Sequence, residues 1–370
     1  MAKRVAIVAS LASSLINFRR PLIERLLANG HAVTALAPHC EATERDLRKM
    51  GVEFVDVPLS RKAWNPLSDA MFFAALTRVF RRLSPDCVLC YTAKPVVYGT
   101  LAAKLAGVPQ IAAMITGLGY SFTSGSGVFR KISRALMCRL YRAALRHTYV
   151  VFFQNPDDMQ LFDSLGLINN CNVKIINGSG VDVDWFSQCA PPKDLSFLMI
   201  ARLLTDKGIR EYVEASRLLR TRHPNIECRL IGWLDSNPTA IRASELTEWV
   251  QSGAIEYLGH LDDVRPALAR CGVYVLPSYR EGTPRTILEA MSIGRAVITT
   301  DAPGCKETVV HGKTGLLVPV RDVNSLVSAM EAFIDLGLDW RAMGSAGRRL
   351  VENKYDARLV SEAIAQALGL

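Results

Sequence analysis

The chain has 370 residues, which is long enough for two domains that each have a core of their own. Its hydrophobic content of 49% with 21% charged residues describes a soluble globular protein, and no stretch approaches 18 consecutive apolar residues, which excludes a membrane-spanning helix. The net charge of +9 is modest and no nucleic-acid-binding motif accompanies it, so nucleic acid is not expected as a partner.

Strand-like apolar runs alternate with amphipathic stretches along the whole chain. This alternation predicts the α/β class, with parallel sheets covered by helices on both faces. In the first half, strands are predicted at 4–10, 32–37, 53–57, 86–91, 110–114, 149–153 and 173–176, and helices at 18–29, 41–50, 66–83, 95–106, 128–147 and 156–165. In the second half, strands are predicted at 196–200, 227–231, 255–258, 273–276, 296–299 and 315–318.

Nine cysteines form an odd set, and several of them lie in apolar runs. We expect reduced thiols in a cytoplasmic protein, because the apolar start Val5–Leu11 is too short for a signal peptide. Cys87 and Cys90 have CxxC spacing, but they fall in one predicted strand, where residues three apart point to opposite faces. Core packing is therefore favoured over a redox pair or a zinc site.

The predicted helix at 128–147 concentrates positive charge. Ile132, Leu136, Leu140 and Ala143 share one face of it, while most of the cations fall elsewhere. A helix of this composition can lie on an anionic membrane surface. The alternative is a surface helix that packs on the sheet with its cations in water. The cations are Arg130, Lys131, Arg134, Arg139, Arg142 and Arg146.

A hinge-like stretch rich in glycine and proline separates the two halves, so we expect one domain over 1–185 and a second over 190–352. Asp182 and Asp184, in this stretch, have the DxD spacing of a metal site. Beside the sequence NGSG they are instead expected in a turn. No metal or other cofactor is predicted.

The second half opens with an apolar run that ends at Arg202, and Lys207 and Gly208 then begin a predicted amphipathic helix. A strand, a short loop and a helix start place both cations at the carboxyl end of a sheet, where α/β folds bind ligands. There they would neutralise a diphosphate and the charge that develops on a leaving group. The alternative is a pair of solvated cations in a loop.

Glu281 and Glu289, separated by seven residues, form the most informative pattern of the chain. Pro284 is well placed to open a helix, which puts Glu281 in the preceding loop and Glu289 inside the helix. The carboxylates suit sugar or ribose hydroxyls, and the backbone N–H groups of the helix start suit a diphosphate. The alternative is a helix with solvated glutamates. The N–H groups would come from Gly282, Thr283, Arg285 and Thr286.

These clusters resemble the family 4 glycosyltransferases, retaining enzymes of the two-domain GT-B type. The resemblance covers nearly the whole chain and is strongest from Phe197 to Pro319. Its motifs occur in the right order as ARLLTDKG, EYLGHLDDVRPAL, VLPSYREGTPRTILEAM and TDAPGCKETVVHGKTGLLV. The resemblance implies a GT-B fold, with two Rossmann-like parallel-sheet domains facing across a cleft. It also implies that a last helix, at 355–370, packs back on the first domain.

The resemblance further implies roles for residues of the second domain. Arg202 and Lys207 would bind the donor diphosphate, with Glu281 on the donor sugar and Glu289 on the ribose. Tyr257 and Leu258 would lie near the base.

On the acceptor side, the resemblance implies that two loops line the cleft. One contains Ser13 and Ser14, where many members have a glycine pair, and the other contains Thr116 and Gly117, where many have a histidine. Specific catalytic duties in these loops are therefore not assigned.

Within the family, the segments NFRRPLI, GLG and GWLDSNPTAI resemble a bacterial subgroup that transfers N-acetylhexosamines from UDP to lipid-diphosphate-linked sugars. The predicted function is transfer from a UDP-sugar to a polyprenyl-diphosphate-linked saccharide, by an enzyme bound peripherally to the inner face of the cell membrane. A GT-B epimerase that uses the same UDP-sugar pocket, and a non-catalytic nucleotide-binding scaffold, are the alternatives.

Overall fold

The computed structural model describes residues 1–59, 65–118, 128–235, 237 and 239–370, with the side chains of 128–131 left out. It divides the chain into two compact domains, residues 1–179 with 357–370 and residues 180–356. The first boundary therefore lies at Ser179 and not at 185. Residues just beyond it belong to the second domain, because Val181 pairs with Asp356 and because Val183 and Phe186 join the second core.

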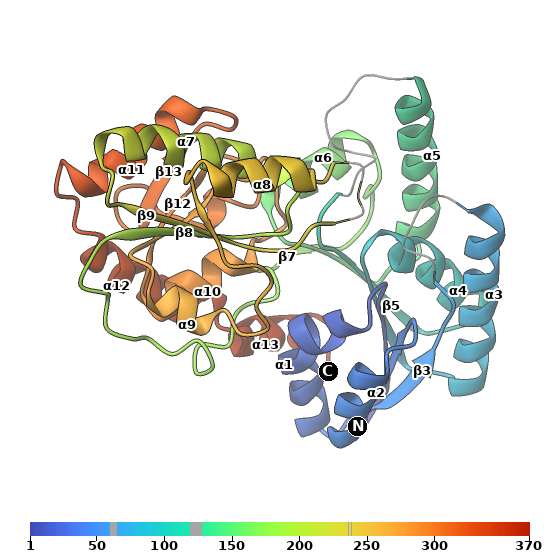
Figure 1. Ribbon diagram of the computed structural model, residues 1–370. Coiled ribbons are helices and arrows are strands. Elements are labelled where there is room, and N and C mark those ends of the chain that lie inside the picture. The colour runs from blue at the N-terminus through green and yellow to red at the C-terminus, as the bar shows by residue number, and fades with distance from the viewer. Residues whose placement is uncertain (60–64, 119–127, 236, 238) are drawn as a thin grey trace. The chain divides into compact units, whose positions relative to one another are not determined.

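The first domain is built on a seven-stranded parallel sheet with the order β3-β2-β1-β4-β5-β6-β7 (Figure 1). Its central strands are buried on both faces, which is why they read as unbroken apolar runs in the sequence. The strands are β1 Arg4–Val8, β2 Ala32–Ala37, β3 Glu53–Asp56, β4 Cys87–Tyr91, β5 Gln110–Ile115, β6 Val150–Phe153 and β7 Val173–Ile175.

Helices cover both faces of this sheet. On one face lie α1 Ser13–Ala28, α2 Glu41–Lys49 and the last helix, α13 Ala357–Ala367 (Figure 1). On the other lie α3 Pro66–Leu83, α4 Thr100–Leu105 with a preceding π-helical turn at Pro95–Gly99, α5 Val128–Leu145 and α6 Pro156–Ser164. The helix α13 packs against α1, where Arg25 Nη2 lies 2.6 Å from Glu362 Oε2.

The second domain has a six-stranded parallel sheet with the order β10-β9-β8-β11-β12-β13. Its strands are β8 Ser196–Ile200, β9 Glu227–Ile231, β10 Glu256–Tyr257, β11 Val273–Leu276, β12 Ala296–Thr300 and β13 Gly315–Val318. The helices α7 Ile209–Arg222, α8 Ala243–Gln251 and α11 Val323–Ile334 lie on one face, and α9 Arg265–Ala269, α10 Arg285–Ile293 and α12 Trp340–Leu350 on the other (Figure 1).

Two expectations, one about the Cys87–Cys90 spacing and one about Asp182 and Asp184, are confirmed. Cys87 and Cys90 are both buried in β4 and pack into different cores on opposite faces of the sheet, so they do not form a pair. Asp182 Oδ1 accepts hydrogen bonds from the backbone N–H groups of Asp184 (3.0 Å) and Trp185 (2.9 Å), which is the expected turn.

Two expectations about helices are wrong. The helix α1 begins at Ser13 and not at 18, so Ser13 and Ser14 lie in its first turn and not in a loop. Serine and asparagine are weak helix formers, but the buried Leu15 draws this segment onto the sheet. In α5 the packed face contains Met137 and Tyr141, whereas Ile132 and Leu136 of the expected apolar face are exposed.

Candidate functional site

The strand order of the second sheet reverses between β8 and β11. In open parallel sheets, ligands bind outside the carboxyl ends of the strands at such a switch point. The loop after β8 carries Arg202 and Lys207, and the loop after β11 leads to Glu281 and α10. The clusters predicted from the sequence therefore come from the two strands that flank the switch point.

Lys207 and Glu281 meet directly at this edge. Lys207 Nζ donates to Glu281 Oε1, and Ser278 Oγ donates to the same oxygen at 2.8 Å. The two charged side chains are only 16% and 15% exposed, so the attraction between them is weakly screened by water. The Tyr279 N–H donates to the carbonyl of Asp206 at 2.9 Å, which holds the two loops together.

Two glycines allow close approach of the loops here, Gly208 between the loops after β8 and β11, and Gly304 between the loops after β12 and β11. Gly208 has φ +73°, and a Cβ at this position would lie 2.1 Å from the Pro277 carbonyl oxygen. Gly304 has φ +82°, and its Cβ would lie 2.2 Å from the carbonyl oxygen of Glu281. Each residue needs both a left-handed backbone and the absence of a side chain.

Arg202 lies at the same edge but pairs with a different acid. Its Nη1 atom is 3.4 Å from Asp235 Oδ2 in the loop that follows β9. That loop runs beside the Arg202 loop, where the Leu203 N–H donates to the Trp233 carbonyl at 3.1 Å. Asp235 and Ser278 were not predicted as site residues. The signal available in the sequence was their position just after a buried strand.

Glu289 lies inside α10, as predicted, and Glu281 lies in the loop before the helix. Pro284 is the residue that caps the helix, which begins at Arg285. Arg285 Nε lies 2.8 Å from Glu289 Oε1. Burial raises the pKa of the Glu289 carboxyl to about 7, and the nearby Arg285 only partly opposes this shift. Gly282 and Thr283 occupy the loop that joins Glu281 to the helix cap.

Tyr257 and Leu258 stand at the carboxyl end of β10, the edge strand beyond β9. The Tyr257 hydroxyl donates to the Gly232 carbonyl at 2.8 Å, and the Leu258 N–H donates to the Leu230 carbonyl at 2.9 Å. Both residues therefore border the loop that contains Asp235.

The first sheet has its own switch point, between β1 and β4. Ser14, in the first turn after β1, shares a 2.7 Å hydrogen bond with the Tyr91 hydroxyl at the end of β4. Ser13 precedes it at the helix start, and Thr116 and Gly117 directly follow β5. These four predicted residues thus lie at the carboxyl edge of the first sheet.

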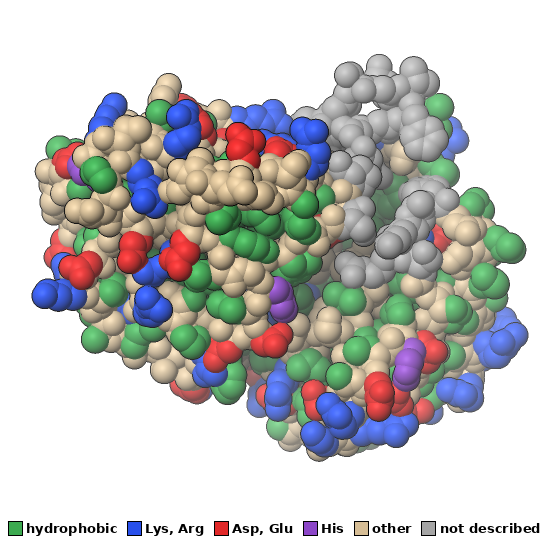
Figure 2. Space-filling view, in the orientation of Figure 1, with side chains coloured by type: hydrophobic (Ala, Val, Ile, Leu, Met, Phe, Trp, Pro, Cys, Tyr) green, Lys and Arg blue, Asp and Glu red, His purple; other side chains and the backbone are tan. Residues whose placement is uncertain are grey.

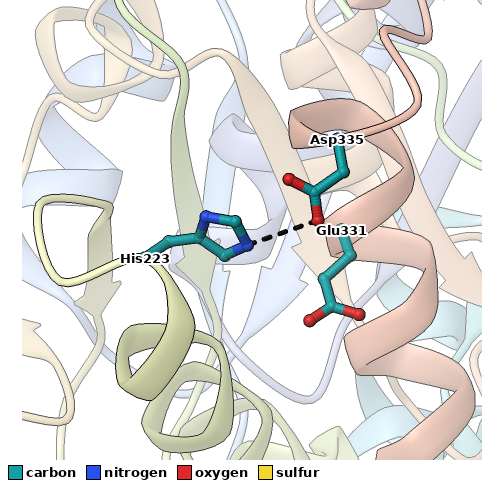
Figure 3. A group of neighbouring side chains, drawn as sticks. All are labelled: His223, Glu331 and Asp335. Atoms are coloured by element: carbon teal, nitrogen blue, oxygen red, sulfur yellow. Dashed lines mark ion pairs between the residues drawn. The ribbon is translucent and has the colours of Figure 1, made fainter.

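Among the residues that the structure describes, His223, Glu331 and Asp335 form one group of possible metal ligands (Figure 3). His223 Nε2 lies 3.4 Å from Asp335 Oδ2, and Glu331 is already paired with Arg222. The group sits where α7 and α11 end. Because these helices run antiparallel to the strands, this is the opposite edge of the sheet from Lys207. The group is therefore no part of the site around Glu281.

Two parallel α/β domains, the second with cations and carboxylates at its switch point, define the GT-B class of glycosyltransferases. The comparisons with known proteins agree. Residues 17–176 match the family model described as "Glycosyl transferase 4-like domain", and residues 194–335 match "Glycosyl transferases group 1". The chain belongs to the family 4 glycosyltransferases.

Named relatives and a solved structure extend the comparison. The chain is 28% identical over 346 residues to the N,N'-diacetylbacillosaminyl-diphospho-undecaprenol alpha-1,3-N-acetylgalactosaminyltransferase of Campylobacter jejuni, covering 90% of this chain and 89% of that protein. It is 24% identical to the UDP-Gal:alpha-D-GlcNAc-diphosphoundecaprenol alpha-1,3-galactosyltransferase of Escherichia coli, over 73% of this chain and 71% of the relative. The sucrose-phosphate synthase of Thermosynechococcus elongatus has a similar fold, with a TM-score of 0.81, 18% identity and 98% coverage of both chains.

We predict that Gly208→Ala lowers the free energy of unfolding by about 2–4 kcal/mol, because the new Cβ would meet the Pro277 carbonyl and because φ is positive. Gly253→Ala is the matched control. Gly253 also has a positive φ, +69°, but nothing lies within 4 Å of the position of its Cβ. In urea denaturation, the free energy of unfolding of the control should fall by only about 1 kcal/mol, the cost of the backbone strain. Equal losses in both variants would contradict the close contact.

A second prediction concerns pH. The pKa of Glu289 is raised in the folded protein, so the folded state holds a proton that the unfolded chain has released. This stabilisation is complete below about pH 4.5 and is lost as the pH rises to about 7. Relative to Glu289→Gln, the wild type should lose about 2–3 kcal/mol of unfolding free energy between pH 5 and pH 7.5. Denaturation curves of both proteins at the two pH values test this, and parallel pH dependences would show that Glu289 is ionised throughout.

Proposed function

We propose that this glycosyltransferase moves a sugar, with retention of its anomeric configuration, from a UDP-sugar to a polyprenyl-diphosphate-linked saccharide. The observation that carries the proposal is the Lys207–Glu281–Ser278 cluster at the switch point of the second domain. The acceptor class is supported by the two relatives that are named for undecaprenyl-diphosphate-linked substrates. The UDP donor is supported by the name of the second relative. An N-acetylhexosamine is the proposed sugar, as in the name of the first relative.

In this mechanism the second domain holds the donor. Lys207 and Arg202 bind the diphosphate, and they stabilise the negative charge that grows as the bond from the anomeric carbon to the phosphate oxygen breaks. The N-terminal end of α10, which begins at Arg285 after the loop that contains Gly282 and Thr283, adds the positive end of a helix dipole. Glu289 accepts a hydrogen bond from a ribose hydroxyl.

Glu281 orients the donor sugar and forms no covalent bond to it. The acceptor hydroxyl attacks the anomeric carbon from the face that UDP leaves, and its proton passes to the departing phosphate oxygen. One carbon–oxygen bond breaks and another forms on the same face of the anomeric carbon, and this same-face attack retains the configuration. The attack on the anomeric carbon and the proton transfer to the phosphate both use groups that the site and the substrates supply.

We further propose that the first domain binds the membrane surface through α5. Ile132 and Leu136 are 61% and 40% exposed, and the exposed Arg139 lies beside them on the helix. Leu67 and Met71, near the start of α3, are also exposed. Exposed apolar side chains next to cations suit the boundary between lipid headgroups and acyl chains.

Not every cation of α5 is available for this role. Arg142 donates to the carbonyl oxygens of Gly166 and Leu165, at 3.1 and 2.9 Å. These hydrogen bonds hold its guanidinium at the C-terminal end of α6. No helix in the described part of the chain is long and apolar enough to cross a membrane.

The transfer reaction is tested with purified protein, a UDP-sugar panel and an undecaprenyl-diphosphate saccharide. Glu281→Gln should lower turnover by about 10²–10³-fold, because the sugar loses its orienting group. UDP binding should not weaken, because the diphosphate no longer competes with this carboxylate for Lys207. Lys207→Ala should lower both turnover and UDP affinity. Glu331→Gln, at the far edge of the sheet, is the control. Unchanged turnover in Glu281→Gln would refute the assigned role, and an NMR spectrum of the product that shows the inverted anomer would refute retention.

The membrane proposal is tested by sedimentation with vesicles that contain an anionic phospholipid. The double variant Ile132→Ser with Leu136→Ser should bind about tenfold more weakly, since two apolar side chains no longer leave water. Val250→Ser, at an exposed valine of the second domain, is the matched control. Binding of the wild type should fall as salt is raised. Equal binding by the double variant and the wild type would contradict a role for α5.

A further inference from the structure

Trp233 is a large aromatic side chain that stays 45% exposed although it directly follows the buried strand β9 and its Gly232. Its ring meets the ring of His260 edge to face, with centroids 5.2 Å apart and planes at 84°. His260 follows β10, the next strand of the sheet. Two rings from neighbouring loops thus meet at the carboxyl edge, on the same edge as Arg202 and Lys207.

The backbone that carries Trp233 is fixed on both sides. Its carbonyl accepts from the Leu203 N–H at 3.1 Å, next to Arg202. The preceding Gly232 donates to the Gly259 carbonyl at 2.9 Å and accepts from the Tyr257 hydroxyl at 2.8 Å. A Cβ on Gly232 would lie 2.0 Å from the Ala201 carbonyl oxygen, so the loop is pressed against its neighbour. The indole is therefore presented from a rigid position.

Along this edge, from β11 to β10, charged side chains that suit a diphosphate come first and aromatic rings that suit a base come last. This is the order of the diphosphate and the base in a nucleoside diphosphate. The charged cluster lies over β8 and β11, Arg202 with Asp235 lies toward β9, and the aromatic pair lies over β9 and β10. On the other flank, Gly304 is packed against the Glu281 carbonyl and Cys305 is buried. Figure 2 shows hydrophobic side chains gathered on the second domain below α8, the helix that follows the Trp233 loop.

We propose that Trp233, braced by His260, stacks on the base of the nucleotide donor. This inference rests on the proposed function, because it takes the diphosphate to lie at Arg202 and Lys207. Stacking on an indole supplies affinity to any base, since every base has an aromatic face. Selection of uracil would then fall to the polar backbone groups of the neighbouring segment at Tyr257 and Leu258.

The test compares two ligands by calorimetry, UDP and inorganic pyrophosphate, of which only UDP carries a base. Trp233→Ala should weaken UDP binding by about ten- to a hundredfold and leave pyrophosphate binding unchanged. Trp233→Phe should recover most of the UDP affinity. Trp185→Ala is the matched control, because Trp185 is another exposed tryptophan of the same domain, stacked 3.6 Å from the Arg265 guanidinium.

The outcomes separate the inference from the proposed function. Undiminished UDP binding by Trp233→Ala overturns the stacking role and leaves the donor assignment intact. Equal loss of UDP and pyrophosphate also overturns it, because the damage would then be general. A wild type that binds GDP or ADP in place of UDP overturns the donor assignment, and the same variants measured with that nucleotide still decide the stacking role. A wild type that binds no nucleotide overturns both.

Discussion

The ion pair between Lys207 and Glu281 is the interaction on which the rest of the site depends. It joins the loop after β8 to the loop after β11, the two strands that flank the switch point, and Ser278 donates to the same carboxylate oxygen. Because both charges are largely buried, each would be costly to leave without its partner. The charged groups are thus held in position before any ligand arrives, which lowers the reorganisation that a reaction requires.

The same pair has an electrostatic consequence. Lys207 is neutralised by Glu281, so the cluster alone offers a diphosphate little net positive charge. Arg202 is partly balanced by Asp235 as well. In the proposed mechanism, a bound diphosphate therefore competes with two carboxylates for its cations, and the dipole at the start of α10 supplies further attraction. This arrangement favours a ligand that also gives Glu281 hydroxyl groups to bind, as a sugar does.

Much of this was predictable from the sequence, for identifiable reasons. Buried parallel strands appear as unbroken apolar runs, and β2, β8, β9, β11 and β13 begin and end where those runs do. Glu281, Glu289 and Lys207 were found because each lies within a few residues of a helix start that has its own local signature. Asp235 and Trp233 were missed because their partners, Arg202 and His260, are distant in sequence and are brought close only by the sheet. Ser278 lies only three residues from its partner Glu281, but a lone serine gives no recognisable signal in the sequence. In α5 the helical period admits two apolar faces, and only packing against the sheet selects the one with Met137 and Tyr141.

The contrast between the two switch points bears on where the acceptor proton goes. At the first sheet the groups that meet are neutral hydroxyls, Ser14 and Tyr91, 2.7 Å apart. Burial raises the pKa of Tyr91 to about 12, so its phenol keeps its proton at neutral pH and cannot serve as a base. In the proposed mechanism, the leaving phosphate oxygen, held by Lys207 and Arg202, accepts the proton of the acceptor hydroxyl as its negative charge grows. The switch point of the first domain thus pairs two hydroxyls, with the Arg19 guanidinium 4.7 Å from the Tyr91 ring centroid, whereas that of the second pairs a cation with a carboxylate.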